Sequence, residues 1–511
     1  MQLLLNNLQE SQLVDVNENV TVAELKQLAS DKFAISKSVD FELKANGKLL
    51  NDEAKVQDLD VVSVSHILKG ASGSGSLSQL ASFGSQNAIT QSSSLLPFKC
   101  SVTKPAPFSI EPREIQPTGT QNYGKTLTFS VHYSSDMFTK CYLVVDIAAA
   151  SPAASYGIVD AQGNVTASYV AQVEDLGHSM IEELTMEIGA VTHLQIPGEW
   201  CHVWDTMSKP YSHRSKEFTG RTSDGGGIDS ALEALPHAPQ RLYIELPFWF
   251  NSYCNAVPLV ALHLSDIKFK IKLRNKNKLY KMTASTGALS QISGIPGGDS
   301  GLLVIDNIKA IGEYIFLPDS IRNTLATIEH YQLIKQIQKS EASIPIGVTQ
   351  FSHSLDFNHM CSEFVWFGRK QNFADSSNSA NSWYLQYYNF SGEEDGTTMG
   401  TANGDFFSTA QLTLNSNERV MALDPKYFRL IHPTNVSHTN VFKEFIYCYS
   451  FGLEPEKLNP SGTLNCSRIE NIHLNLKFSK ALAYAYDFFV FAINYNVVRI
   501  SSGVSSVSFS S

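Results

Sequence analysis

One strand pattern occurs twice in this sequence. Residues 267–273 and residues 472–478 each alternate apolar and polar side chains, and each run follows a short aromatic segment, at residues 248–250 and 449–451. Alternation of this length is typical of a half-buried strand. The two strands are offset by 472 − 267 = 205 residues, which leaves room for a whole domain. The pattern therefore predicts one β domain used twice, an organisation that favours a structural building block over an enzyme.

Length and composition fit two such domains and a small third one. The chain has 511 residues, and a prior of roughly 150 residues per domain gives about three domains. Hydrophobic residues make up 43% of the chain and charged residues 17%, and 29 Phe and 20 Tyr are present. This balance favours half-buried strands over disorder or long helices. We expect a globular, mainly β protein.

Charge and cysteine usage exclude several classes of function. The formal net charge of −10 opposes the wrapping of nucleic acid, because phosphate neutralisation needs clustered Lys and Arg. We therefore expect no direct nucleic-acid binding. The seven cysteines are widely spread and form no CxxC pair, so we predict buried free thiols in a reducing compartment rather than disulfides or a zinc cluster.

Neither a secretory signal nor a membrane span is expected. The chain begins directly with an alternating strand, without a basic region followed by an apolar core. The most apolar late stretch, residues 481–498, is interrupted by Asp487, Asn494 and Asn496. We interpret it as two consecutive strands.

Residues 1–70 have the pattern of a small domain with the order β-β-α-β-β. Strand signals at residues 3–5 and 12–16 precede a helix entry at Thr21, and a turn at residues 46–47 precedes a closing strand at residues 61–68. Over essentially its whole length this segment resembles ubiquitin and its ribosomal-fusion relatives. The resemblance implies a ubiquitin-like (β-grasp) fold.

Two departures from ubiquitin favour a structural use of this domain. Lys44 stands where the receptor-binding patch of ubiquitin has an isoleucine, and a cation there would need desolvation without an evident partner. The conjugating tail is replaced by the Gly/Ser sequence of residues 71–76, which is typical of a flexible tether. We therefore expect weak binding to ordinary ubiquitin receptors and no conjugation.

The rest of the chain divides into two β domains. We expect a first domain at residues 77–275, a polar connector at 276–300 and a second domain at 301–511. Strands are predicted at residues 127–131 and 142–147, the second one covered on both faces. Aromatic-rich strands are predicted at residues 248–250 and 488–491. The long polar stretch of residues 372–404 is predicted to be an exposed insertion.

Several separate segments of residues 75–511 resemble the double jelly-roll major capsid proteins of nucleocytoplasmic large DNA viruses. The clearest is the run RLYIELPFWF at residues 241–250 with the apolar segment 257–262. The other matching segments are residues 76–80, 83–87, 177–183, 187–189, 198–200, 314–317, 329–334, 460–469 and 492–500. Their order and spacing carry the resemblance across roughly 430 residues, and the segment at 314–334 would open the second jelly roll.

The resemblance implies a structural, non-enzymatic subunit built from two tandem jelly rolls. In this family three copies form a pseudo-hexagonal capsomer of an icosahedral double-stranded DNA virus shell, assembled in the host cytoplasm. Expected partners are copies of the same chain, minor capsid, cement or penton proteins, and an internal membrane. The ubiquitin-like domain would lie on the inner side of the shell as a bridging or anchoring element.

Several residues are of the types found in catalytic or metal-binding sites. The tetrapeptide 298–301 resembles the surroundings of the trypsin-like nucleophile, but Ser300 has no upstream partner that could supply the base. His330 beside Glu329, His353 and His359 near Asp356, and the acidic residues 393–395 form no closed ligand set. We interpret them as structural, and Trp200, Trp204, Trp249 and Trp366 as core or subunit contacts. The sequence predicts no catalytic residue, no cofactor and no metal site.

Four alternatives remain open at this point. The chain could be a minor capsid protein, or a ubiquitin-pathway decoy in which the capsid-like part is only a scaffold. Residues 1–70 could act as a removable folding chaperone of a capsid protein. The fourth alternative is a hydrolase that uses Ser300, and a fluorophosphonate probe would detect it.

Overall fold

The computed structural model describes most of residues 107–509 and several short segments before them. The described ranges are 2–6, 11–15, 24–25, 27, 41–45, 48–49, 61–66, 107–148, 157–159, 165–209, 216–220, 239–284, 303–371, 387–392, 404–436, 438 and 444–509. The chain forms two compact units, residues 1–107 and residues 108–511. Each is described by itself.

The first unit contains one five-stranded sheet with the order β2-β1-β5-β3-β4. Its two central strands, β1 and β5, are parallel, and the other neighbours are antiparallel. The described helical residues 24, 25 and 27 lie where the sequence predicts a helix after Thr21. This arrangement is compatible with a ubiquitin-like domain, an assignment that stays a prediction, and the tether at 71–76 lies outside the described residues. The strands are β1 (Gln2–Asn6), β2 (Ser11–Asp15), β3 (Phe41–Ala45), β4 (Lys48–Leu49) and β5 (Val61–His66).

The first half of the second unit is a sandwich of two antiparallel sheets. One sheet has the order β14-β9-β18-β6 and the other β13-β12-β16-β8-β7. Eight strands form the framework: β6 (Ser109–Ile115), β8 (Thr126–Ser130), β9 (Met137–Ile147), β12 (Ile181–Ile188), β13 (Val191–Pro197), β14 (Gln240–Glu245), β16 (Ile267–Leu273) and β18 (Ile305–Phe316).

The second half is a sandwich of the same kind. Its sheets have the orders β19-β27-β21-β24 and β20-β26-β22-β23. The strands are β19 (His330–Ile344), β20 (Gln350–Ser354), β21 (Met360–Lys370), β22 (Thr409–Leu414), β23 (Asn417–Leu423), β24 (Tyr447–Ser450), β26 (Ile472–Lys477) and β27 (Tyr486–Ser501).

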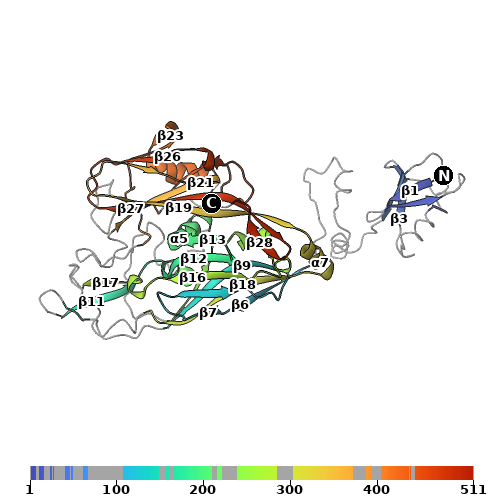
Figure 1. The fold of residues 1–511 in the computed structure, drawn as a ribbon, viewed down its shortest axis with the longest axis horizontal. Coiled ribbons are helices and arrows are strands. Elements are labelled where there is room, and N and C mark those ends of the chain that lie inside the picture. The colour runs from blue at the N-terminus through green and yellow to red at the C-terminus, as the bar shows by residue number, and fades with distance from the viewer. Residues whose placement is uncertain are drawn as a thin grey trace. The chain divides into compact units, whose positions relative to one another are not determined.

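The two sandwiches have the same connectivity (Figure 1). When the eight framework strands of each sandwich are numbered in chain order, one sheet follows 1-8-3-6 and the other 2-7-4-5 in both. First and last strands lie side by side, and every connection crosses between the sheets except the one from the fourth to the fifth strand, which pair with each other in one sheet, as in a jelly roll. The predicted double jelly-roll fold is confirmed. β16 and β26, the two strands that reveal the repeat in the sequence, are the seventh strand of each roll.

Shorter elements connect or extend these sheets. A three-stranded sheet with the order β10-β11-β17 lies beside the first roll, and β15, β25 and β28 extend the main sheets. Their bounds are β7 (Pro117–Thr118), β10 (Gly157–Val159), β11 (Val165–Gln172), β15 (Val257–Pro258), β17 (Tyr280–Ala284), β25 (Leu464–Asn465), β28 (Val504–Val507), α4 (Leu176–Met180), α5 (Gly198–Ser208), α6 (Lys216–Thr219), α7 (Asp319–Thr327) and α8 (His432–Asn435). Single helical turns are η2 (Trp249–Asn251), η3 (Tyr253–Asn255), η4 (Leu259–Ala261), η5 (Lys276–Lys278), η7 (Tyr427–Ile431) and η8 (Cys466–Arg468).

Alternation of apolar side chains explains why these segments form strands. In β16 the buried positions are every second residue from Ile267 to Leu273, and β8 follows the same rule around Leu127 and Phe129. In the longer β27, residues 488–496 are all buried. One hydrophobic core runs through both rolls. Half-buried outer strands and fully covered central strands are what a sandwich requires.

The first correction concerns the boundary between the rolls. We expected the second jelly roll to begin at residue 301, with residues 314–317 opening it. Instead β18 pairs with β9 and β6 and is the last strand of the first roll. The physical reason is closure, because the first roll hides the edges of its first and third strands only when its eighth strand lies between them. The connector expected at 276–300 also contains β17, which pairs with β11.

Three local expectations also differ from the structure. Residues 248–250 were expected in a strand, but Trp249 and Phe250 lie in η2, where the chain turns after β14. The predicted pair of strands at 481–498 is one long strand, β27, because its partner β19 is equally long. Within the polar stretch 372–404, the described residues Tyr387, Tyr388 and Phe390 are buried rather than exposed, since their rings pack against the core.

Two further observations concern membranes and cysteines. Among the described residues, no helix is both long enough and apolar enough to cross a membrane. The six cysteines in the described part of the chain are free, and five of them are buried. The exposed one is Cys254, whereas Cys100 lies outside the described residues. The prediction of buried free thiols is therefore confirmed for five positions and wrong for Cys254.

Candidate functional site: the contact between the two jelly rolls

Helix α5 is the element of the first roll that lies against the second roll. It follows β13 directly, and Pro197 precedes its first residue. A Cβ on Gly198 would lie 2.0 Å from the carbonyl oxygen of Ile181, so only glycine lets the helix begin this close to β12. Most of the helix is buried, and Figure 1 shows it beside β13, between the sheets of the two rolls.

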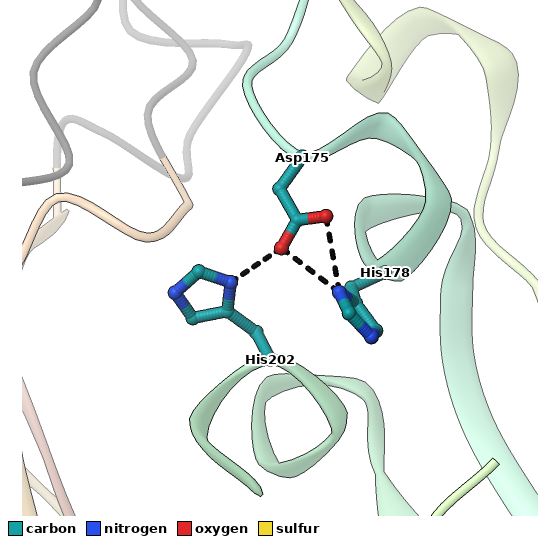
Figure 2. A group of neighbouring side chains, drawn as sticks. All are labelled: Asp175, His178 and His202. Atoms are coloured by element: carbon teal, nitrogen blue, oxygen red, sulfur yellow. Dashed lines mark hydrogen bonds and ion pairs between the residues drawn. The ribbon is translucent and has the colours of Figure 1, made fainter. Parts of the chain in front are cut away.

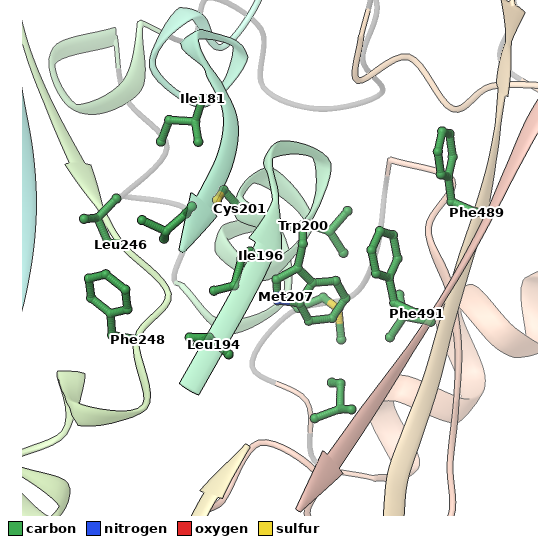
Figure 3. Packing of buried hydrophobic residues seen from close by; sticks show 14 of the residues in the cluster. Ile181, Leu194, Ile196, Trp200, Cys201, Met207, Leu246, Phe248, Phe489 and Phe491 are labelled. Atoms are coloured by element: carbon green, nitrogen blue, oxygen red, sulfur yellow. The ribbon is translucent and has the colours of Figure 1, made fainter. Parts of the chain in front are cut away.

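An apolar contact joins α5 to the second roll. Trp200 is 2% exposed, and its ring lies 5.0 Å from the ring of Phe491 on β27, centroid to centroid. Figure 3 shows Trp200 and Met207 of α5 facing Phe491, while Cys201 and Ile196 face the first roll. Burying an indole against an aromatic ring stabilises a contact through area and ring geometry together. The two rolls therefore share one core instead of touching only at their surfaces.

A buried polar cluster lies beside this apolar contact. The Nδ1 atom of His178 lies 2.9 and 3.0 Å from the two carboxylate oxygens of Asp175, and Nδ1 of His202 lies 2.5 Å from Oδ2 of the same residue. All three side chains are at most 2% exposed. Figure 2 shows the carboxylate of Asp175 between the two imidazole rings. Asp175 has φ +52°, a left-handed conformation that aspartate tolerates better than most residues.

The second roll completes this cluster. Nε2 of His202 lies 3.1 Å from Oε2 of Glu444, which also accepts a hydrogen bond from the hydroxyl of Thr206 on α5. The ring of Tyr388 stacks on the imidazole of His202 at 3.8 Å with an interplanar angle of 7°. His202 is thus held between Asp175 of the first roll and two residues of the second.

Burial and charge act against each other in this cluster. Burial raises the pKa of Asp175, but the imidazoles of His178 and His202 outweigh that effect and hold the pKa well below its usual range. Burial lowers the pKa of His202, and its bonds to Asp175 and Glu444 outweigh burial and raise it. Opposite charges in a low-dielectric site therefore stabilise each other's charged forms.

A second polar contact joins the rolls at the start of α5. The carboxylate of Glu199 lies 3.8 Å from the guanidinium of Arg369 on β21 and 3.8 Å from that of Arg274, which follows β16. Burial raises the pKa of Glu199, but Arg369 and Arg274 outweigh burial and hold the pKa below its usual value. One acid of the first roll is therefore shared by cations of both rolls.

A third cluster lies within the second roll, near the same contact. Nε2 of His438 lies 2.7 Å from Oε1 of Glu363, and its Nδ1 lies 2.9 Å from Oε1 of Glu456. The side chains of His438 and Glu363 are each 1% exposed. The sulfur of Cys448 lies in the same group. Burial lowers the pKa of His438, but Glu363 and its other partners outweigh burial and raise it above the usual range.

A cavity of about 450 Å³ adjoins this third cluster. Side chains of both rolls form its walls, among them Trp204 and Trp249 from the first roll and Lys335 and His438 from the second. The indole N–H of Trp249 is buried, and among the described residues it has no hydrogen-bond partner.

Hydrogen bonds and an ion pair hold the remaining edges of the contact. Arg322 on α7 forms an ion pair with Asp136 at 2.5 Å, and the same carboxylate accepts the backbone N–H of Leu317, so the chain between the rolls is anchored at its start. His193 on β13 bonds to two parts of the second roll: its carbonyl accepts from Gln336, and its Nε2 lies 3.0 Å from the hydroxyl of Ser505. These contacts surround α5 and restrict rotation of one roll against the other.

Within its described residues, the structure does not bring together the residues that the sequence suggests as catalytic or metal-binding candidates. Ser300 and the acidic residues 393–395 lie outside the described residues. His330 bonds to the carbonyl of Leu325, His353 to the hydroxyl of Ser340, and the backbone N–H of His359 to Ser467. Three tryptophans are largely buried in the core, and Trp204 is partly buried against it.

The polar clusters at the contact are the residues that sequence reasoning missed. In the sequence, His178 belongs to one of the segments that resemble the capsid family, whereas Asp175, His202 and Glu444 belong to no recognisable motif. The three-residue spacing of Asp175 and His178 is a weak signal, because it matches neighbouring positions on any helical turn. Glu444 is 242 residues from His202 along the chain, so no local pattern can connect them. These buried groups can hold charge, protons or a cation, and they are closed to a large substrate.

Comparison with known proteins covers both rolls. Residues 97–318 match the family described as major capsid protein N-terminus, and residues 322–506 match the family described as large eukaryotic DNA virus major capsid protein. The junction between the two matches falls after β18, in agreement with the sheet pairing.

Individual relatives and solved structures agree with these families. The major capsid protein of Pyramimonas orientalis virus is 26% identical over 468 residues, covering 85% of this chain and 99% of the relative. That of Paramecium bursaria Chlorella virus 1 is 25% identical over 473 residues, with the same coverage. Among solved structures, PBCV-1 VP54 has a TM-score of 0.61 at 20% identity and covers 81% of this chain and 100% of its own. The Faustovirus major capsid protein has a TM-score of 0.61 at 13% identity, covering 81% of this chain and 94% of its own.

Proposed function

This chain belongs to the family of large eukaryotic DNA virus major capsid proteins, and from that premise we propose that three copies form one pseudo-hexagonal capsomer of an icosahedral shell. The protein is a structural component of the virion capsid. The observation that carries the proposal is the presence of two jelly rolls with identical connectivity in one chain. Three such pairs around a threefold axis present six similar lobes, which suits a hexagonal lattice.

The contact between the rolls supports this role mechanically. A lattice subunit must keep a constant angle between its two lobes, because that angle sets the positions at which neighbouring subunits bind. Trp200 in the shared core and Glu199 between cations of both rolls hold α5 against the second roll. Buried polar groups with specific partners favour one arrangement over others.

We also propose a domain division that follows the sheets. Residues 77–317 would form the first jelly roll, Pro318 and α7 the connection, and residues 330–511 the second roll. β18 and the anchoring of Leu317 by Asp136 support the first boundary. We assign no catalytic role, because the histidines of the two clusters at the contact, His202 and His438, are buried and paired with carboxylates.

Mass measurement tests the trimer directly. Light scattering coupled to size exclusion should give a species near 3 × 56.4 = 169.2 kDa, because the lobes of a lone chain leave their lateral faces uncovered. A stable monomer at micromolar concentration would contradict the trimer and favour a minor capsid role, while the family assignment would stand.

The second part of the proposal concerns residues 1–70. We propose that this ubiquitin-like domain lies on the inner side of the shell, where it bridges capsomers or contacts minor proteins or an internal membrane. The Gly/Ser sequence of residues 71–76 supports a tethered element rather than a fixed lobe.

Protease protection tests this placement. A protease that cuts the 71–76 tether should release residues 1–70 from free capsomers and leave them attached in intact particles, because a sealed shell excludes the enzyme. The control is the same digestion on particles opened by a chaotrope. Equal cleavage in intact and opened particles would contradict the inner position, and mature particles without residues 1–70 would indicate a removable chaperone.

A further inference from the structure

We propose that Asp175, His178 and His202 form a structural site for one divalent transition-metal cation, for which Zn²⁺ is the best match. The site concerns the chain's own fold and does not depend on assembly into a shell. It departs from the expectation of no metal site, which rested on sequence spacing alone. Two imidazole nitrogens and a carboxylate oxygen are a ligand set that zinc accepts.

The three potential ligand atoms already lie close together. One carboxylate oxygen of Asp175 is 2.5 Å from Nδ1 of His202 and 2.9 Å from Nδ1 of His178, and all the ligand atoms lie within 4.8 Å of one another. Around a tetrahedral Zn²⁺ with bonds of about 2.0–2.1 Å, neighbouring ligand atoms lie about 3.3–3.4 Å apart. The two distances from the Asp175 oxygen therefore need to lengthen by less than about 1 Å for a cation to enter, which rotation of the three side chains can supply.

Glu444 lies where an outer partner of a metal site lies, that is, a residue that forms a hydrogen bond to a metal ligand without binding the metal itself. It accepts from Nε2 of His202, the nitrogen opposite the one that faces Asp175. A proton on Nε2 leaves the lone pair of Nδ1 free and directed toward the site. A histidine that binds a metal through one ring nitrogen usually donates the N–H of its other nitrogen to a carboxylate, a backbone carbonyl or water. This hydrogen bond sets the tautomer and raises the basicity of the metal-binding nitrogen.

The charges of the cluster also suit a dication. Asp175 and Glu444 are each 1% exposed, so two negative charges are buried together. One divalent cation with two neutral imidazoles brings the sum to zero. Without a metal, the same balance requires both imidazoles to carry a proton, and buried charges are costly unless they are fully paired.

The surroundings contain a further polar atom that this site could use. Tyr388 stacks on His202 and closes that side of the cluster to solvent. Its hydroxyl is buried, and within the described ranges it has no hydrogen-bond partner. A water molecule that fills the fourth position of the metal could donate to it, which would satisfy an otherwise unpaired group.

The cluster around His438 provides an internal contrast. It combines a carboxylate and a cysteine with a single histidine, and both ring nitrogens of His438 lie within 3 Å of a carboxylate oxygen, from Glu363 and from Glu456. His202 is also paired at both nitrogens, with Asp175 and with Glu444, but its cluster holds a second imidazole, that of His178, beside the same carboxylate. Two imidazoles around one carboxylate distinguish the proposed metal site from the cluster of His438, in which one imidazole pairs with two carboxylates.

The metal would hold α5 in place against the second jelly roll. All three ligands belong to the first roll: His178 lies on α4, Asp175 directly before α4, and His202 on α5. The outer partner Glu444 belongs to the second roll. Loss of the ion would leave α5 and the second roll joined by the apolar contact, the ion pair of Glu199 with Arg369 and the hydrogen bonds.

The experiment measures the metal content of the purified full chain after growth with added zinc and exhaustive dialysis. Elemental analysis should find about one zinc per chain. Asp175→Asn should lose the metal, and His438→Gln, the matched control in the other cluster, should keep it. Thermal unfolding of the wild type should shift downward with a zinc chelator and recover when Zn²⁺ is returned.

A gentler variant keeps the test decisive if Asp175→Asn does not fold. Glu444→Gln retains all three ligands and alters only the outer partner, so zinc affinity should fall by about 10–100-fold, measured by competition with a chromogenic chelator. Folded wild-type protein that holds no zinc and shows no binding on titration with ZnCl₂ overturns the proposal. Equal zinc content in the wild type and a folded Asp175→Asn variant overturns it as well.

Discussion

Replacing Trp200 by alanine should lower the free energy of unfolding of the jelly-roll unit by about 3–5 kcal/mol, the usual cost of truncating a buried large aromatic side chain. Trp200 is 2% exposed, and its ring packs on Phe491 across the contact between the rolls. The lost volume lies where two independently closed sandwiches meet, so neither one can collapse to fill it. Urea unfolding followed by tryptophan fluorescence and circular dichroism measures this loss.

The position of Trp200 predicts more than a loss of stability. Because the residue joins two rolls that share one core, its removal should also separate their unfolding, and calorimetry should show two transitions in place of one. Trp366→Ala is the comparison, since Trp366 packs on Phe428 and Tyr447 inside the second roll. That variant should be destabilised to a similar degree without changing the coupling between rolls.

A second variant on the same helix serves as the matched control. Trp204 lies one turn after Trp200, is only partly buried, and borders the cavity. Trp204→Ala should therefore cost clearly less than Trp200→Ala, because fewer packed atoms are lost. Equal effects of the two substitutions would show that α5 as a whole, and not the Trp200 contact, governs the stability of the interface.

His438→Ala should cost about 3–5 kcal/mol at pH 6.5, because it leaves the buried carboxylate of Glu363 without its hydrogen-bonded cation. The side chains of both residues are 1% exposed, and their atoms lie 2.7 Å apart. The double variant Glu363→Gln with His438→Gln removes both charges and should cost less than the single substitution. A loss below about 1 kcal/mol in His438→Ala would contradict a buried charged pair at this position.

The pH dependence of this effect has a defined sign. Burial lowers the pKa of His438, but Glu363 and the other partners raise it above the unfolded value of 6.5. Below pH 6.5 both states hold the proton and the stabilisation is fully present. Above pH 6.5 the unfolded chain releases the proton first, so the contribution falls by about 1.4 kcal/mol per pH unit until the folded pKa is passed.

The measurement compares the wild type with His438→Ala between pH 6.5 and about pH 7. Neighbouring groups set this window: burial lowers the pKa of Lys335 to about 8 and that of His432 below 6.5, so Lys335 stays mostly protonated and His432 mostly neutral inside it. The difference in unfolding free energy between the two proteins should shrink as the pH rises. A constant difference would show that His438 is neutral in the folded state.

The sequence could predict those parts of the fold that local patterns encode. Alternating side chains identify β16 and β26, and their equal position in the two rolls makes the repeat visible without any structure. The continuous apolar run of β9 indicates a covered strand in the same way. Short aromatic runs are less reliable indicators of strands, because aromatic side chains can be buried from a helical turn as well as from a strand, as at residues 248–250.

Local patterns in the sequence are enough to predict two β domains of one kind in this chain, since alternation and its repetition depend on residues a few positions apart. The closure of the first roll by β18 and the contact of α5 with the second roll become visible only in the folded protein, because strand pairing and packing connect distant residues. The cluster of Asp175, His202 and Glu444 spans two rolls and is brought together only when both are folded. A site assembled from such separated side chains leaves no spacing in the sequence by which it could be found.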